Sequence, residues 1–130
     1  MAIEQPITFS GTLSFPVDDG TPNCDVGVAL SAVFQHKADY KFEFTSAGNK
    51  DVDFGTLALN GAKVLLIEVY PDSSGAALPV VLTVNGGTDT WQLSPGGALL
   101  YLNPNPAAGG ILSTNLAWTS AATVRLRVFG

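Results

Sequence analysis

The sequence has very few of the residues on which catalytic and metal chemistry most often depends. Cys24 is its only cysteine and His36 its only histidine. A single cysteine excludes an internal disulfide, and with it the disulfide-bonded scaffolds of small secreted proteins. A zinc site needs three or four ligands, and one histidine with one cysteine cannot supply them. The acidic stretch 18–20 lacks the spacing of a calcium-binding loop. We therefore expect no metal centre and no bound cofactor.

Charged residues are also scarce, at 13% of the chain against roughly 25% in an average soluble domain. Only six are basic and the net charge is −5, which argues against nucleic-acid binding because phosphates require a basic patch. No charged residue occurs in residues 90–124. A surface rich in Ser, Thr, Asn and Gly would account for this. Because 46% of the residues are hydrophobic, we favour the alternative, that other subunits cover part of the surface.

Long hydrophobic runs are absent as well. The longest, such as 64–67 and 98–102, are far shorter than the roughly 20 residues of a transmembrane helix, so we expect no membrane insertion. The first residues, MAIEQPITF, lack the basic and then apolar regions of a signal peptide. We expect the protein to be made in a cytoplasm and used without export by such a signal.

No pattern in the sequence predicts catalysis. His36 has no serine or cysteine in a strained G-x-S-x-G elbow to activate. Asp25 follows Cys24 directly and disfavours a reactive thiolate. Glu43 and Glu68 lie in expected strands, and nothing singles them out as a catalytic carboxylate pair. We therefore predict that the protein is not an enzyme and has no catalytic residues.

The sequence does contain many short apolar stretches separated by turn residues. Its 14 glycines and 8 prolines lie between these stretches rather than in one tract. Alternation with a period of two predicts strands with one buried face, as in residues 122–130, where Arg125 and Arg127 point outward. The run 62–70 is apolar on both faces around its centre and predicts a central strand covered on both sides. The predicted strands are 7–15, 25–34, 40–45, a weaker one in 52–57, 62–70, three within 79–103, 111–120 and 122–130. We predict loops at 16–23 and 71–77 and a turn at 46–51.

Residues 79–103 contain three of these apolar runs. They are separated by Asn85-Gly86-Gly87 and by Pro95-Gly96-Gly97. Asn-Gly and Gly-Gly reach the positive φ of tight hairpin turns, and Pro presets the first central residue of a turn. We predict a three-stranded antiparallel meander here.

About eight to ten short strands without a helical period predict an all-β fold. We expect a single antiparallel β-sandwich domain over residues 1–130, and we favour a jelly-roll type over an immunoglobulin-like one. Edge strands without lysine guards favour pairing with a neighbouring subunit.

Three aromatic residues permit a different function, a carbohydrate- or receptor-binding module. Trp91, Tyr101 and Trp118 could stack on saccharides if they were exposed. However, Trp91 alternates in phase with Leu93, and Trp118 with Leu116, which favours burial.

The C-terminal part, VNGGTDTWQLSPGGALLYLNPNPAAGGI with the closing AATVRLRVFG, resembles the small all-β virion proteins of tailed bacteriophages. The shared features are a PGG turn between apolar strands, an N-P-x-x-GG-like excursion and an (A)ATVR-x-R-x-x-G ending. The resemblance covers about the last fifty residues. It implies a jelly-roll subunit, a homotrimer, that decorates or cements the capsid or is a related head or tail accessory. Its expected location is the virion, and its expected partner is the major capsid protein or another virion protein.

In such an assembly we expect the charge-free stretch to supply much of the contact between subunits, with residues 103–110 as a docking or exposed tip. The residues predicted at the interface are Trp91, Leu93, Leu99, Leu100, Tyr101, Leu102, Pro104, Pro106, Ile111, Leu112 and Trp118.

Overall fold

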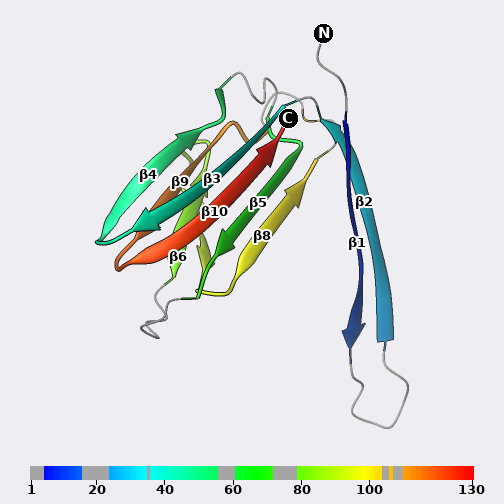
Figure 1. The fold of residues 1–130 in the computed structure, drawn as a ribbon, viewed down its shortest axis with the longest axis horizontal. Helices are drawn as coiled ribbons and strands as arrows, with labels where there is room; N and C mark the ends of the chain where they lie inside the picture. The colour runs from blue at the N-terminus through cyan, green and yellow to red at the C-terminus, as the bar shows by residue number, and fades with distance from the viewer. Residues whose placement is uncertain are drawn as a thin grey trace.

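In the computed structural model the chain forms two four-stranded sheets and a separate two-stranded ribbon (Figure 1). The structure describes residues 5–15, 24–34, 36–55, 61–71, 79–103, 106 and 110–130. Its strands are β1 (Gln5–Phe15), β2 (Cys24–Phe34), β3 (Lys37–Phe44), β4 (Gly48–Asp53), β5 (Val64–Val69), β6 (Val80–Val84), β7 (Trp91–Leu93), β8 (Ala98–Leu102), β9 (Ser113–Trp118) and β10 (Ala122–Phe129).

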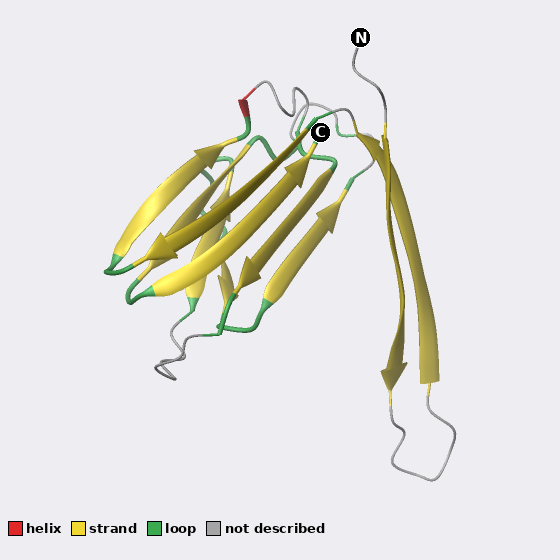
Figure 2. Ribbon diagram, viewed as in Figure 1, coloured by secondary structure: helices red, strands yellow, loops and turns green. Residues whose placement is uncertain are grey.

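The two four-stranded sheets face each other as the layers of a β-sandwich, as Figure 2 shows. One sheet has the order β3-β10-β5-β8 and the other β4-β9-β6-β7, and every pairing is antiparallel. The predicted all-β sandwich is confirmed. From β3 to β6 successive strands alternate between the two sheets, so that each connection crosses from one layer to the other.

The core lies between the two sheets and consists of every second residue of the facing strands. Ile67 of β5 and Leu126 of β10 are completely buried, and so are Leu82 and Leu116 of the other sheet. Burying a leucine or isoleucine side chain contributes about 1.5–3 kcal/mol. The alternation predicted for 122–130 is confirmed, since the residues that alternate with the arginines are buried. The predicted central position of this strand is also confirmed, because β5 lies between β10 and β8. Its expected burial on both faces is not observed, because Leu66 and Glu68 are only half-buried.

A row of stacked aromatic rings closes the core along β3. Tyr40, Phe42 and Phe44 stack in succession with ring centroids 5.8 and 5.7 Å apart, and Phe44 stacks on Trp118 of β9. The Trp118 indole N–H donates a hydrogen bond to the Ser46 carbonyl. The predicted burial of Trp118 is confirmed. Its ring is packed, and its indole N–H is hydrogen-bonded, by residues of the same chain.

The three-stranded meander predicted for residues 79–103 is wrong in its second half. β6 and β7 form the expected hairpin, but β8 pairs with β5 in the other sheet. The Gly96 N–H donates to the Val69 carbonyl (2.7 Å), and the Val69 N–H donates to the Gly97 carbonyl (2.9 Å). These two bonds attach the Pro95-Gly96-Gly97 turn to the end of β5, so the chain passes from one sheet to the other at this turn.

The turn predicted at 46–51 is shorter than expected. β4 begins at Gly48, which pairs with Trp118 of β9. Pairing with β9 thus holds residues 48–51 in a strand, although their local sequence favours a turn. Of the weak strand predicted at 52–57, Val52 lies in β4 and Phe54 is buried beyond its end, while Leu57 lies outside the described residues. The predicted loop 16–23 and most of 71–77 and 103–110 also lie outside them.

β1 and β2 form a ribbon, here called the arm, that pairs with neither sheet. Each strand has 11 residues, and they pair from Gln5 with Phe34 to Phe15 with Cys24. Phe34 contacts Phe129 edge to face with ring centroids 4.9 Å apart, and the His36 and Gly130 backbones exchange two hydrogen bonds. These contacts hold the base of the arm, from which it extends alongside and beyond the sandwich (Figure 1).

Candidate functional surface

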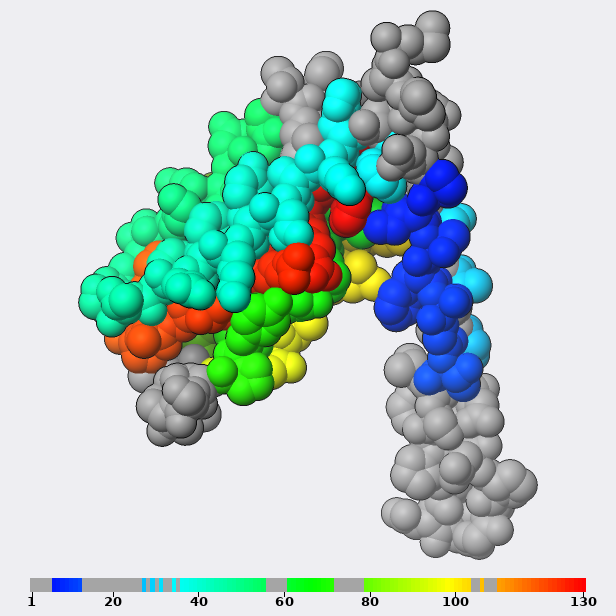
Figure 3. Space-filling view, viewed as in Figure 1, coloured from blue at the N-terminus to red at the C-terminus, as the bar shows by residue number. Residues whose placement is uncertain are grey.

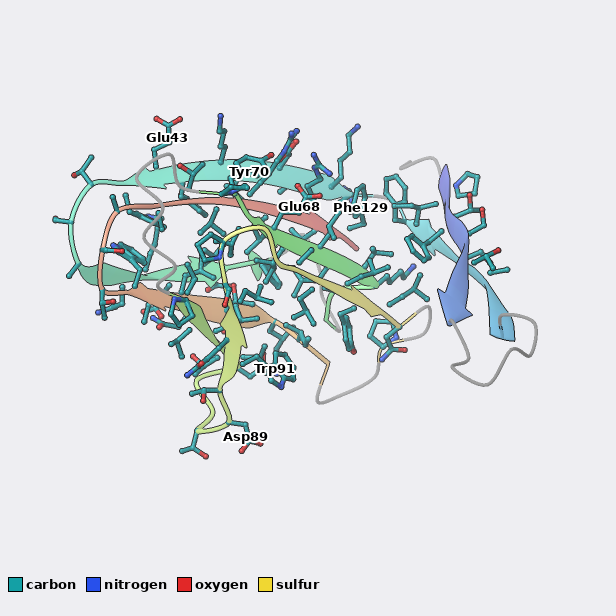
Figure 4. All side chains as sticks on the ribbon, turned by 90° about the horizontal axis from the view of Figure 1, so that it is seen from below. Glu43, Glu68, Tyr70, Asp89, Trp91 and Phe129 are labelled. Atoms are coloured by element: carbon teal, nitrogen blue, oxygen red, sulfur yellow. The ribbon has the colours of Figure 1, made fainter. Side chains whose placement is uncertain are left out.

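The side of sheet β3-β10-β5-β8 that faces away from the core is here called the outer face. Its residues alternate with the core residues along the four strands, so they lie in register across the sheet. They are Lys37, Asp39, Lys41, Glu43, Val64, Leu66, Glu68, Ala98, Leu100, Leu102, Thr123, Arg125, Arg127 and Phe129. Figure 4 shows Glu43, Glu68 and Phe129 on this side of the molecule.

One half of the outer face carries a network of charged side chains. Arg125 binds Asp39 with two parallel hydrogen bonds, from Nε to Oδ1 (3.0 Å) and from Nη2 to Oδ2 (2.7 Å). Arg127 lies between two carboxylates, 3.8 Å from Asp39 Oδ2 and 3.7 Å from Glu68 Oε1. The prediction that both arginines face outward from the last strand is confirmed.

Within this network, the protonation equilibria of Asp39 and Arg125 are shifted toward the charged forms. The hydrogen bond from Arg125 holds the pKa of the Asp39 carboxyl below its usual value, and the charges of Arg125, Arg127 and Lys37 act in the same direction. In turn, the Asp39 carboxylate and the Tyr70 phenol raise the pKa of Arg125. A general acid or base works best with a pKa near neutrality. The pKa of Asp39 is lowered and therefore lies further from that range.

The other half of the outer face is apolar and meets the base of the arm. A groove of about 210 Å³, here called the arm groove, lies between them. It is lined by Ile7, Thr8 and Phe9 from the arm and by Val64, Leu66, Leu100, Leu102, Arg127 and Phe129 from the sheet. Figure 3 shows the opening between the arm and the sandwich. Phe9 is 46% exposed and Leu100 36% exposed, so two large apolar side chains border the groove without being covered.

The residues predicted at an interface lie in several different environments. Ile111 and Trp118 are buried in the core, and Leu93, Leu99 and Tyr101 are partly buried against it. Trp91, Leu100 and Leu112 are exposed, Leu102 and Pro106 are half-buried, and Pro104 lies outside the described residues. Of the predicted set, Leu100 and Leu102 line the arm groove.

The sequence did not point to the groove residues contributed by other strands. Ile7 and Phe9 belong to an alternating segment that predicts ordinary burial, and Leu66 belongs to a run expected to be covered on both faces. An available signal was the pairing of two apolar alternating strands, 7–15 and 25–34, across one loop. Two such strands can form a ribbon whose apolar face needs a partner.

Trp91 is the exposed aromatic residue of the opposite sheet. It pairs with Leu82 and shares the inner phase of Leu93, as predicted. Its predicted burial is not observed, because β7 is an edge strand and the side chain is 44% exposed. Figure 4 shows Trp91 on the side of the molecule away from Glu43 and Glu68.

His36 lies between β2 and β3, where its backbone pairs with Gly130, consistent with a connecting residue. Within the described ranges, no three His, Cys, Asp or Glu side chains are grouped so as to hold a metal ion. No helix in the described part of the chain is long and apolar enough to cross a membrane. Neither a known protein family nor a curated protein matches this chain.

Proposed function

We propose that this protein is a structural subunit of a tailed-bacteriophage virion. In this proposal a jelly-roll sandwich forms a closed homo-oligomer, a trimer, that binds the capsid surface through the major capsid protein or another virion protein. Its role is to stabilise the shell as a decoration or cement protein.

The strand order supports a jelly roll. With the sandwich strands β3 to β10 numbered 1 to 8 along the chain, one sheet has the order 1-8-3-6 and the other 2-7-4-5. This is the order that results when a long antiparallel hairpin wraps into two Greek keys, as in viral capsid domains. An immunoglobulin-like sandwich divides its strands differently, with its first two strands in the same sheet.

The observation that carries the assembly proposal is the exposed apolar surface at the arm groove. Phe9 and Leu100 border it from two different elements, and Leu66, Leu102 and Phe129 continue it as half-buried residues. Contiguous exposed apolar surface marks interaction sites in soluble proteins. The assignment to a virion is supported, in addition, by the resemblance of the C-terminal residues to phage virion proteins.

The first experiment is the mass of the purified protein by light scattering behind a sizing column, at two concentrations. We expect a concentration-independent mass of three copies of the 13.5 kDa chain. A monomer at the higher concentration would contradict the assembly proposal. The virion assignment is tested separately by cosedimentation with capsid shells of the phage that encodes the protein, and its absence from the pelleted shells would contradict it.

The exposure of Trp91 favours a second candidate, a carbohydrate-binding module. Tyr101 is partly buried against the core and Trp118 is buried, so of the three aromatic residues Trp91 has the surface to stack on a sugar. Specific binding on a glycan array that Trp91→Ala abolishes would establish this function. Leu112→Ala is the matched control, because Leu112 is also 44% exposed.

A further inference from the structure

We propose that the arm groove binds a single aliphatic chain of about eight carbons that ends in an uncharged oxygen, such as a hydroxyl group or an ester carbonyl. The chain lies on the apolar floor of the groove, and the oxygen accepts a hydrogen bond from Arg127. This inference goes beyond the proposed function, because the ligand occupies the floor of a groove formed within one chain. The proposed assembly depends instead on the exposed side chains at the border of the groove.

The floor of the arm groove consists of two rows of side chains that cross the strands β10, β5 and β8. The rows are Phe129–Val64–Leu102 and Arg127–Leu66–Leu100. Cross-strand partners lie side by side on one face of a sheet. The second row therefore begins with a guanidinium group on β10 and continues with two apolar side chains. This order gives the floor a polar end and an apolar end, and it sets the direction in which an amphipathic chain would lie.

The arm supplies the opposite wall of the groove through residues 7–9. The base of the arm is held by Phe34, which packs edge to face on Phe129 with ring centroids 4.9 Å apart. Among the described residues that line the groove, Thr8 and Arg127 are polar and the others are apolar. Ligand sites are mostly apolar and contain a small number of polar groups that fix the orientation of the ligand. The arm groove has this composition.

The volume of the groove limits the size of the ligand. An engineered apolar cavity of about 150 Å³ binds benzene, a molecule of six carbons. In proportion, the volume of about 210 Å³ in the arm groove accommodates about eight carbons. Sites for drug-sized ligands measure about 300–1,000 Å³. A single aliphatic chain therefore fits the groove, whereas a drug-sized molecule or a two-chain lipid exceeds it.

Arg127 differs from Arg125 in having hydrogen-bond donors to spare. Arg125 binds Asp39 with two hydrogen bonds of 3.0 and 2.7 Å. The ion pairs of Arg127 are longer, 3.8 Å from Nε to Asp39 Oδ2 and 3.7 Å from Nη1 to Glu68 Oε1, and such distances are too long for hydrogen bonds. Within the described residues its guanidinium group thus has ion-pair partners and no hydrogen-bond acceptor. Its N–H groups are available to a ligand in the groove.

The two neighbouring carboxylates determine the charge of the ligand. Asp39 and Glu68 balance the charges of Arg125 and Arg127. A third carboxylate, brought in by an anionic ligand, would lie close to both and be repelled. An uncharged oxygen accepts a hydrogen bond from Arg127 without this repulsion. The arrangement therefore favours a neutral polar end over an acid.

The test is a titration of the purified protein with the primary alcohols hexanol, octanol and decanol, followed in the two-dimensional amide NMR spectrum. We expect saturable binding of octanol, with the largest shifts at residues 7–9, 64–66 and 100–102. Each buried methylene group changes the affinity about fourfold, so octanol should bind roughly tenfold more tightly than hexanol. Decanol should gain no more than about twofold over octanol, because its last carbons extend out of the groove.

Two results of this titration would overturn the proposal, and neither depends on a variant. One is the absence of saturable binding. The other is an affinity that rises from octanol to decanol as steeply as from hexanol to octanol, which is the behaviour of non-specific adsorption. The mass of the protein is measured in parallel, so the outcome for the ligand is separate from the outcome for the oligomer.

A larger side chain in the floor should block the groove. Leu66→Trp should weaken the binding of octanol at least about tenfold, because the indole displaces two or more methylene groups of the chain. Leu112→Trp is the matched control, since it makes the same change at an exposed position outside the groove lining, and it should bind octanol as the wild type does. Equal affinities of the two variants would overturn the location of the site.

The polar end of the site is tested with Arg127→Met and with sodium octanoate. Arg127→Met keeps an apolar side chain in the floor and loses the donors, so octanol should bind about tenfold more weakly. Octanoate should bind the wild type about fivefold more weakly than octanol, because of its repulsion from the carboxylates. Unchanged binding of octanol by Arg127→Met would overturn the role of Arg127. Octanoate that binds as tightly as octanol would overturn the neutral polar end.

Discussion

The arm and the sandwich are built from the same kind of sequence but differ in what covers their apolar residues. In the sandwich, Leu126 alternates with arginines and is fully buried against the facing sheet. In the arm, Phe9 alternates with Thr8 and Ser10, yet it is 46% exposed. Period-two alternation therefore shows that one face of a strand is made for burial. It does not show whether the covering surface comes from the same chain.

The two regions also differ in how their backbone is held. Sandwich strands are paired within sheets and tied by connecting segments, as where the Ala62 N–H donates to the Ile111 carbonyl (2.7 Å). The arm strands pair with each other along 11 residues. Substitutions in the sandwich should therefore change the free energy of unfolding strongly. Substitutions in the arm should change it little and should instead affect the assembly of the oligomer.

The largest effect is expected at Gly61. Its φ is +113°, and an added Cβ would lie 2.7 Å from the Gly110 Cα, so Gly61→Ala forces two backbone segments apart. We expect a loss of about 3 kcal/mol or more in the free energy of unfolding, from strain and overpacking together, measured by urea denaturation. Gly11→Ala in the arm is the control, because no atom lies within 4 Å of its added Cβ. A Gly61→Ala variant as stable as Gly11→Ala would contradict the close approach.

Truncating one apolar side chain in each region should sharpen the comparison. Leu126→Ala removes a completely buried side chain and should cost about 2–5 kcal/mol in the free energy of unfolding. Phe9→Ala should change the unfolding of the dilute monomer by less than about 0.5 kcal/mol. Both values come from denaturation at a concentration below assembly. Equal losses would mean that the arm belongs to the core of its own chain.

The strands of the sandwich could be predicted because their signal is local, whereas the sheet to which each belongs depends on distant contacts. The turn at Pro95-Gly96-Gly97 has residues that suit a hairpin. Its hydrogen bonds to Val69 instead attach it to the other sheet. A local sequence pattern cannot indicate a hydrogen-bond partner that is so distant in the sequence.

The candidate surface was predictable only in part, for a similar reason. Leu100 and Leu102 lie in the charge-free stretch that drew attention to this region. Phe9 and Leu66 reach the same groove from segments far away in the sequence. Their sequence patterns are those of ordinary core strands, so the groove can be recognised only from the three-dimensional arrangement of the strands that line it, which are β1, β5, β8 and β10.

A polar side chain with a structural role should give an intermediate effect. Asn85 accepts hydrogen bonds from the N–H groups of Leu112 (2.7 Å) and Ser113 (3.3 Å) and donates one to the Gly110 carbonyl (2.8 Å), and its φ is +53°. Asn85→Gly keeps the backbone conformation and loses these bonds, whereas Asn85→Ala also strains φ. We expect Asn85→Gly to lose about 1–2 kcal/mol and Asn85→Ala about 1 kcal/mol more in thermal or urea unfolding. Equal losses of stability in the glycine and alanine variants would show that the positive φ of residue 85 makes no contribution of its own.

Thr114 should give a smaller effect of the opposite sign. It is 2% exposed, and its hydroxyl has no hydrogen-bond partner among the described residues. Thr114→Val removes an unsatisfied polar group without changing the shape of the side chain. We expect the free energy of unfolding to stay the same or rise by up to about 1 kcal/mol. Thr114→Ser, which keeps the hydroxyl and loses the methyl group, should be less stable than the wild type. A loss of stability in the valine variant would show that the hydroxyl is satisfied.

The smallest effect should come from the Asp39–Arg125 pair on the outer face, because both side chains are substantially exposed. Arg125 lowers the pKa of Asp39 in the folded protein, whereas in the unfolded chain the carboxyl has its usual value. The pair therefore stabilises the fold fully above that usual value, and the contribution disappears as the pH falls through the lowered one. In urea titrations the midpoint difference between wild type and Asp39→Asn should be constant down to about pH 5 and should shrink as the pH falls below the usual carboxyl pKa of about 3.9. The other carboxyl groups titrate in both proteins, so their contributions cancel. A difference that persists unchanged at the acid end would mean that the ionised carboxylate of Asp39 contributes nothing to the sandwich, and that its bond to Arg125 only orders the outer face.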